Sequence, residues 1–123
     1  MFYKTIEEFS DIVASFSVLE HKRYGSGMSF AAKVRFVNES VLHIRDYLFL
    51  DGRRKYSYHW QDVEGNLISR WDNSPHHKEV PTYPHHRHIS GEITESHEWT
   101  LRDILKVISD RIGISEKKNK NDS

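Results

Sequence analysis

The sequence predicts an α+β fold: an antiparallel meander sheet of about five strands with helices packed on one face. Two observations predict it. Alternating apolar and polar segments in the middle of the chain are separated by turn-forming residues, and apolar residues recur at helical spacing near both ends. The chain has 123 residues, which fits one domain. We expect a single domain over 1–114 and a disordered polar tail over 115–123.

A helix is expected at each end of the domain. Thr5 and Glu8 have the spacing of a capping box, and apolar residues follow at helical spacing, which predicts a first helix near 5–14. Thr100 and Asp103 form a similar pair and predict that a last helix begins near Thr100. The apolar stripe of this last helix consists of Leu101, Ile104, Leu105, Ile108 and Ile112.

Five strands are expected between the helices. They span residues 16–23, 29–37, 41–50, 53–62 and 66–72. Turn-forming residues connect the last four of them, which favours hairpins. Residues 73–90 contain three prolines and five histidines, so we expect a long functional loop there. The start of this region, 72–75, has the Asp-Asn-Ser-Pro composition that is typical of a turn.

The register of neighbouring strands follows from the turns, because a one-residue slip would turn every side chain to the other face. We expect a two-residue turn at Glu64-Gly65, a three-residue loop over 50–52 with Gly52 in a left-handed bulge, and a three-residue loop over 38–40. The resulting opposite pairs are Tyr58 with Trp71, His59 with Arg70, Ile44 with Tyr58, His43 with His59, Val34 with Ile44 and Arg35 with His43.

This register gives the sheet an apolar face, which the helices should cover. It carries Phe30, Ala32, Val34, Phe36, Leu42, Ile44, Leu48, Tyr56, Tyr58, Trp60, Leu67 and Trp71. We therefore expect Tyr58, Trp60 and Trp71 in the core, where they are not free to stack on bases.

The opposite face is cationic and hydrogen-bonding. It carries Lys33, Arg35, His43, Arg45, Ser57, His59, Gln61, Arg70 and Asp72. The whole chain is neutral, with 18 Lys and Arg against 18 Asp and Glu, so the segregation of charge indicates an anionic ligand such as a nucleic-acid backbone. A solvated sheet face without a ligand is the alternative that the sequence leaves open.

The histidines are distributed unevenly along the chain. Six of the nine lie between His59 and His88, so this region gains positive charge on mild acidification. The chain has no cysteine, which excludes thiolate metal sites and a cysteine nucleophile. It has no apolar run of about 18 residues and no secretory signal, so we expect a cytoplasmic protein without a membrane partner.

Three blocks surround these histidines: YSYHWQ at 56–61, RWDNSPHH at 70–77 and YPHHRH at 83–88. Together they resemble the TumE family of toxins from prokaryotic toxin–antitoxin operons, over roughly residues 27–105. The resemblance implies a small cytosolic toxin with an antitoxin partner that carries a DNA-binding domain. It leaves the molecular target and a homodimer open. The matching residues are Tyr58, His59, Trp60, Arg70, Trp71, Asp72, Asn73, His76, His77, Pro84, His85, His86 and His88.

Metal-free cleavage of RNA is the chemistry that these residues favour. It needs a base for the ribose 2′-hydroxyl, an acid for the leaving oxygen and a cation for the phosphorane, and histidine and arginine suit these roles. We therefore predict a histidine-dependent ribonuclease that needs no cofactor. The candidate catalytic residues are His59, Arg70, His85, His86 and His88. The candidate substrate-binding residues are Lys33, Arg35, Arg45, Asp72, Asn73, His76, His77 and Arg87.

Two other functions stay open. A non-enzymatic toxin would block a nucleic-acid or protein target by binding alone. A metal-dependent hydrolase would use His86 and His88, which point the same way on an extended chain. A further ligand from His59, His76 or Asp72 would complete a zinc or manganese site.

Overall fold

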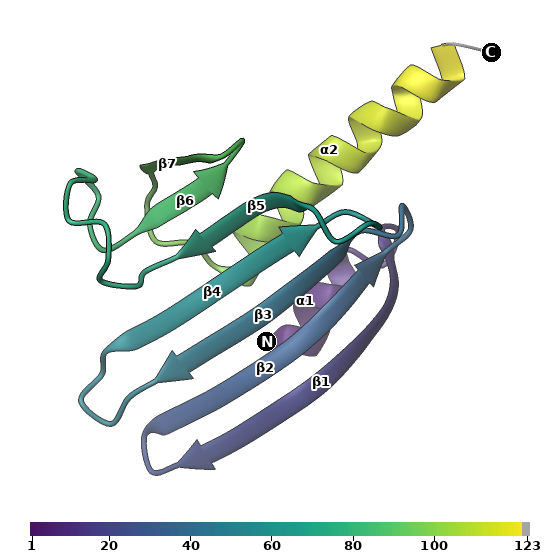
Figure 1. Cartoon of the computed structure of the whole chain (residues 1–123). Coiled ribbons are helices and arrows are strands. Elements are labelled where there is room, and N and C mark those ends of the chain that lie inside the picture. The colour runs from purple at the N-terminus through teal and green to yellow at the C-terminus, as the bar shows by residue number, and fades with distance from the viewer. Residues whose placement is uncertain (122–123) are drawn as a thin grey trace.

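The computed structural model describes the backbone of residues 1–121 and the side chains of residues 1–113. Their elements are α1 (Phe2–Glu8), β1 (Val13–Tyr24), β2 (Gly27–Phe36), β3 (Val41–Leu48), β4 (Arg54–Gln61), β5 (Leu67–Asp72), β6 (His86–Ile89), β7 (Glu92–Glu95) and α2 (Leu101–Asn121). The strands lie in chain order in one sheet, and each pairs antiparallel with the next (Figure 1). The predicted α+β meander is therefore confirmed.

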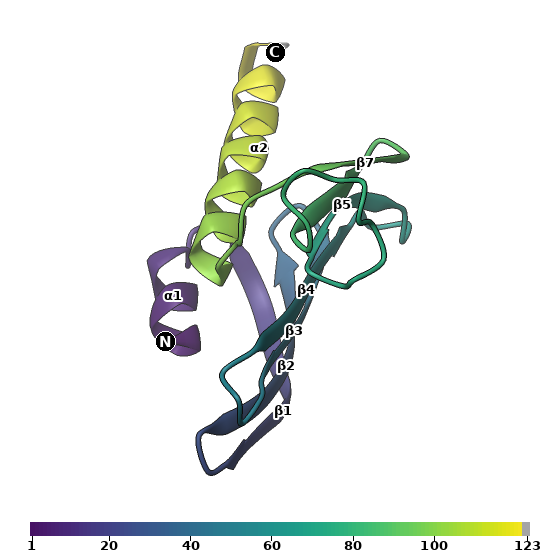
Figure 2. The ribbon, with the colours of Figure 1, turned by 90° about the vertical axis from the view of Figure 1, so that its left-hand side faces the viewer.

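Both helices lie on the same side of the sheet (Figure 2). Ile6 of α1 and Ile104 of α2 are buried in one core with the apolar strand residues. The core consists of Ile6, Ile12, Ala32, Val34, Phe36, Leu42, Ile44, Tyr56, Tyr58, Trp60, Trp71, Ile104, Leu105, Ile108 and Ile112. The other side of the sheet carries no helix in the described part of the chain (Figure 2).

The helix boundaries differ between the two ends. The Thr100–Asp103 capping box is confirmed: the Thr100 amide donates to Asp103 Oδ2 at 3.1 Å, and α2 follows. The first helix is shorter and earlier than predicted, because Thr5 lies inside α1 and its hydroxyl donates to the Met1 carbonyl at 2.8 Å. At the other end, α2 continues to Asn121, into the segment where we predict a disordered tail. Residues 122 and 123 lie outside the described residues.

The prediction of about five strands is too low, because the described sheet has seven. β6 and β7 lie at its edge and form a hairpin within and beyond the expected long loop. Its two-residue turn is Ser90-Gly91, and both residues have positive φ angles, 53° and 75°. A turn of this kind matches the twist of a two-stranded hairpin.

The predicted register is confirmed between β3, β4 and β5 and is wrong between β2 and β3. Lys33, not Arg35, lies opposite His43, because the loop is Val37–Glu39 and Phe36 pairs with Ser40. Glu39 takes the left-handed position, with a φ angle of 69°. The shift is two residues, so every side chain keeps its face.

The turn between β4 and β5 also differs from the prediction. The Asp62 amide donates to the Asn66 carbonyl, which makes a three-residue loop. An irregularity after Trp60 restores the predicted register farther along the strands. Leu67 lies at this irregular end and is 46% exposed, so its predicted place in the core is wrong.

No helix in residues 1–121 is both long and apolar enough to cross a membrane.

Candidate functional site

A row of polar residues crosses the face of the sheet that the helices leave open. Lys33, His43, His59, Arg70 and His88 lie opposite one another on the consecutive strands β2 to β6. Directly opposite residues of antiparallel strands have Cβ atoms about 5 Å apart. The meander therefore gathers, side by side, residues that are up to 55 positions apart in the chain (33 to 88).

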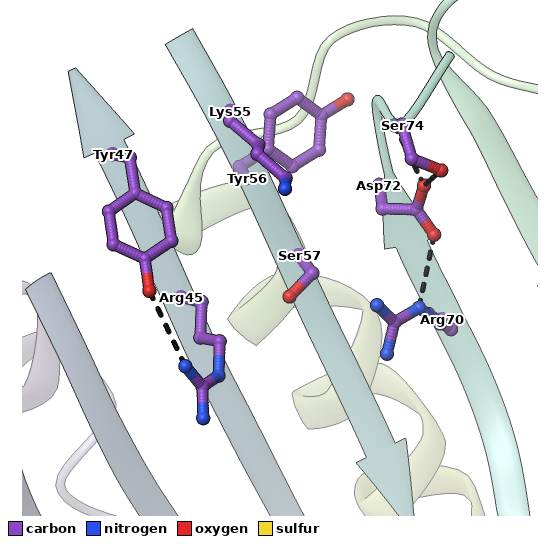
Figure 3. A pocket seen from close by; sticks show the side chains of 8 residues that line it. All are labelled: Arg45, Tyr47, Lys55, Tyr56, Ser57, Arg70, Asp72 and Ser74. Atoms are coloured by element: carbon purple, nitrogen blue, oxygen red, sulfur yellow. Dashed lines mark hydrogen bonds and ion pairs between the residues drawn. The ribbon is translucent and has the colours of Figure 1, made fainter. Parts of the chain in front are cut away.

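A pocket of about 240 Å³ adjoins this row, with Ser57 at its centre. Ser57 lies between Arg45 on β3 and Asp72 on β5, and its short side chain leaves a depression (Figure 3). The guanidinium groups of Arg45 and Arg70 lie on either side of the Ser57 hydroxyl (Figure 3). The complete lining is Arg45, Tyr47, Lys55, Tyr56, Ser57, Arg70, Asp72 and Ser74. Two guanidinium groups, an ammonium group and a hydroxyl suit a phosphate group.

His43 and His59, which we call the histidine pair, lie next to this pocket. Their ring centroids are 6.1 Å apart. Partial burial lowers the pKa of His43, and the charges of Lys33 and Arg45 lower it further. Burial also lowers the pKa of His59, together with the charge of Arg70. Both imidazoles of the histidine pair are therefore neutral at neutral pH.

Arg70 connects the histidine pair to Asp72. Its Nη1 atom lies 3.3 Å from His59 Nδ1, and a guanidinium group only donates, so this ring nitrogen accepts. Arg70 Nε donates to Asp72 Oδ2 at 3.0 Å, an interaction drawn in Figure 3. Arg70 is thereby held with part of its guanidinium group toward the pocket.

Asp72 organises this region from a buried position, since only 3% of it is exposed. Its Oδ1 atom accepts from the backbone amide and the hydroxyl of Ser74, so the predicted turn at 72–75 is confirmed. Burial opposes ionisation, but these hydrogen bonds and the one from Arg70 Nε outweigh it and lower the pKa of Asp72. The carboxylate is therefore ionised. Its oxygens lie 2.9 Å from His86 Nε2 and 3.4 Å from His88 Nε2.

Three histidines, His77, His86 and His88, gather beside Asp72, and we call them the histidine trio. His77 comes from the loop after β5, and His86 and His88 come from strand β6. Candidate ligand atoms of the three side chains all lie within 4.8 Å of one another. The sequence hypothesis of a metal site named His76 as a further ligand, but His76 is exposed and its neighbour His77 lies with the others.

His59, Arg70, His86 and His88 belong to one network, but His85 does not share it. Consecutive residues of an extended chain point to opposite faces. The His85 ring stacks on Tyr56, and its Nδ1 atom lies 2.9 Å from the Tyr56 hydroxyl on the helix side. His85 therefore lies apart from the other four candidate catalytic residues.

Two candidate substrate-binding residues are engaged within the protein. Arg87 also points to the helix side, where its Nε donates to Ser69 and its guanidinium group lies 4.7 Å from the Trp71 ring. Asn73 extends the sheet: its Oδ1 accepts from the Tyr56 amide, and its Nδ2 donates to the Arg54 carbonyl. Lys33, Arg35 and Arg45 are exposed on the open face.

Sequence reasoning did not name Lys55 or Tyr47 as site residues. Lys55 precedes Ser57 and His59 at alternating positions of β4, so the period of two places these three side chains on one face. Tyr47 lies opposite Lys55, and its hydroxyl accepts from Arg45 at 3.4 Å. The alternation within β4 was the signal that would have placed Lys55 on the same face as Ser57 and His59.

Comparison with known proteins identifies the family of the chain. The family model described as Toxin TumE matches residues 2–112. No match was found among curated proteins or among solved structures. The match covers nearly the whole chain and includes both the histidine pair and the histidine trio. The chain therefore belongs to the TumE family of toxins.

Proposed function

We propose that this toxin acts on RNA as a histidine-dependent endoribonuclease and that cleavage occurs on the open face of the sheet. Family membership supports the role of a toxin in a toxin–antitoxin system, with an antitoxin as partner. One observation carries the chemistry: a pocket of about 240 Å³ between Arg45 and Arg70 adjoins two histidines whose ring centroids are 6.1 Å apart.

The pocket would hold the scissile phosphate over Ser57. Arg45 and Arg70 come from strands on either side of it, so they contact different oxygens of the same phosphate (Figure 3). Arginine on two sides also stabilises the extra negative charge of the phosphorane, which is the main electrostatic requirement of the reaction. Exposed Lys33 and Arg35 on β2 extend the cationic surface for neighbouring phosphates.

The histidine pair would supply the proton transfers. One imidazole removes the proton of the ribose 2′-hydroxyl, and the 2′-oxygen attacks phosphorus. The other imidazole, protonated, gives its proton to the departing 5′-oxygen. The products are a 2′,3′-cyclic phosphate and a 5′-hydroxyl end, so no water and no metal ion enters the first step.

Substrate binding would prepare the pair for these two roles. The pKa values of both histidines are lowered partly by neighbouring cations, Lys33 and Arg45 for His43 and Arg70 for His59. The phosphodiester monoanion between the guanidinium groups offsets this positive charge. One of the two imidazoles then takes up a proton more readily, which gives the acid that the reaction needs.

Recognition would be directed at the backbone of RNA. Trp60 and Trp71 are 1% and 0% exposed, so these large rings are not free to stack on bases. A face of guanidinium, ammonium and imidazole groups favours phosphates and therefore relaxed base specificity. The required 2′-hydroxyl excludes DNA as a substrate.

The test compares RNA with DNA of the same sequence in the presence of EDTA. Wild-type protein is expected to cut the RNA but not the DNA, and the RNA products should end in 2′,3′-cyclic phosphate. His59→Ala is expected to lose this activity, whereas His21→Ala is the control, because His21 lies on β1 opposite Phe30, on the helix side. Cleavage of DNA, or equal cleavage of RNA by His59→Ala, would contradict the proposal.

A further inference from the structure

The histidine trio is not used by the proposed cleavage reaction. His77, His86 and His88 come from a loop and a strand, and their rings lie edge to face, with centroids 4.8 Å apart for His77–His86 and 4.9 Å for His86–His88. Three imidazole rings at these distances share one small volume, so an interaction must stabilise their close approach.

His86 presents one ring nitrogen without a partner. Its Nδ1 atom is 2.9 Å from the Pro84 carbonyl, which only accepts, so Nδ1 carries a proton. In the neutral ring, Nε2 then carries a lone pair, and His86 is only 1% exposed. Nε2 lies 2.9 Å from Asp72 Oδ1, yet the two atoms are not aligned for a hydrogen bond. A lone pair therefore faces a carboxylate oxygen in a buried place, an arrangement that a cation would stabilise.

The other two histidines fit the same arrangement. The exposed Glu79 carboxylate accepts from His77 Nδ1 at 3.3 Å, which leaves His77 Nε2 free. His88 is half-buried, and its Nε2 lies 3.4 Å from Asp72 Oδ2. In metal-binding histidines, the ring nitrogen that is not a ligand usually donates to a carbonyl or a carboxylate. Pro84 and Glu79 supply these two acceptors here.

We propose that His77, His86 and His88 bind a divalent transition-metal ion of the zinc type, with the Asp72 carboxylate balancing its charge. Neutral imidazole nitrogens suit Zn²⁺ and its neighbours, whereas Mg²⁺ and Ca²⁺ prefer oxygen ligands. Ligand nitrogens of a tetrahedral zinc site lie about 3.3 Å apart, since each is about 2.0 Å from the ion. The trio is within 4.8 Å, so small side-chain rotations close the site.

Such an ion would fasten the loop that carries His77 to strand β6. It would also add positive charge next to Arg70, which shares Asp72 with the trio. The proposal is independent of RNA cleavage, because it depends only on the positions of the three rings and of Asp72.

The test is calorimetric titration of the full chain, prepared without a histidine tag and freed of metal by a chelator, with Zn²⁺. We expect one equivalent to bind and the melting temperature to rise, with no such rise in Mg²⁺. His77→Ala and His88→Ala should each weaken Zn²⁺ affinity by more than the roughly 10–100-fold that loss of an outer-sphere partner costs.

His76→Ala is the matched control, since it removes an exposed histidine from the same loop. Its Zn²⁺ affinity should equal that of the wild type, and circular dichroism should show all three variants folded. The proposal is overturned if the wild type binds no Zn²⁺ at micromolar concentrations. It is also overturned if His76→Ala weakens binding as much as His77→Ala and His88→Ala do.

Discussion

The open face of the sheet carries two groups of histidines with different neighbours. The histidine pair, His43 and His59, is flanked by Lys33, Arg45 and Arg70. Two members of the histidine trio, His86 and His88, lie beside the ionised carboxylate of Asp72. The neighbours of an imidazole, more than its presence, therefore decide its chemistry. Cations favour a neutral imidazole beside an anionic substrate, and a carboxylate favours a bound cation.

The two groups are also built differently. The pair lies on the central strands β3 and β4, in the middle of the cross-strand row. The trio depends on β6, the strand next to the edge strand β7, and on the loop before it. Catalytic side chains on central strands are held in position by the sheet, whereas a metal ligand on a loop needs an additional interaction to hold it in position.

The largest expected effect falls on the histidine pair. His59→Ala removes a group that transfers a proton, which contributes roughly 10²–10⁴-fold in comparable reactions. RNA cleavage should fall by such a factor, and growth inhibition by the toxin in a bacterial host should be relieved. His21→Ala, on the helix side of the sheet, should remain as toxic as the wild type, so equal relief by both variants would show that toxicity does not depend on the pair.

Arg70 joins the two groups and gives the next effect. Arg70→Gln removes one of the two guanidinium groups beside Ser57, and loss of one group that stabilises the transition state costs roughly 10²–10³-fold. Arg70→Lys keeps the charge and should recover part of the rate. An unchanged rate of RNA cleavage in Arg70→Gln would show that the scissile phosphate binds elsewhere on the open face.

The variant Asn73→Ala tests whether Asn73, which lies between the two groups, stabilises the fold rather than binds substrate. Both ends of its amide bind backbone groups of β4, so Asn73→Ala leaves the Tyr56 amide and the Arg54 carbonyl without these partners. We expect the free energy of unfolding to fall by about 1–3 kcal/mol, measured by urea denaturation. Cleavage per folded molecule should be unchanged. A large loss of cleavage without loss of stability would return Asn73 to the substrate-binding residues.

The smallest effect concerns the pH dependence of cleavage. The groups that face His43 are Lys33 on β2, Arg45 on its own strand and His59 on β4. Because the pKa values of His43 and His59 are both lowered, both limbs of the pH profile should lie below about 6.5, so kcat/KM falls as the pH rises above this value.

Lys33→Gln removes one of the charges that lower the pKa of His43. The His43 limb should then move to higher pH by a fraction of a unit, while the other limb stays in place. Glu39→Gln changes a charge in the exposed loop beyond β2 and serves as the control. If this limb moves to lower pH or does not move, His43 does not contribute to the pH dependence of kcat/KM.

The central part of the fold was predictable because its signals are local. Alternation fixed the faces of β3 and β4, and Gly52, with a φ angle of 88°, marked the loop that sets His43 opposite His59. The pairing of β2 was not predictable in this way, because a glutamate, Glu39, holds the left-handed turn position that composition assigns to glycine or asparagine. The Ser90-Gly91 turn was a usable signal that the histidine-rich composition of the region obscured.

The candidate site was predictable only in part. Period-two alternation brings His59, Arg70, His86 and His88 to one face, but the same rule sends His85 and Arg87 to the other. The choice between His76 and His77 depends on the course of an irregular loop, which no periodicity describes. The pocket at Ser57 arises from a small side chain among large ones, so it follows from packing in three dimensions.

RNA cleavage in EDTA by the wild type, by His77→Ala and by His59→Ala distinguishes the roles of the two histidine groups most directly. If the pair transfers protons and the trio binds metal, the wild type and His77→Ala should cleave at equal rates, and His59→Ala should not cleave. The contradicting result is loss of wild-type cleavage in EDTA, its recovery with Zn²⁺ and inactivity of His77→Ala. That result would make the histidine trio the centre of a metal-dependent hydrolase.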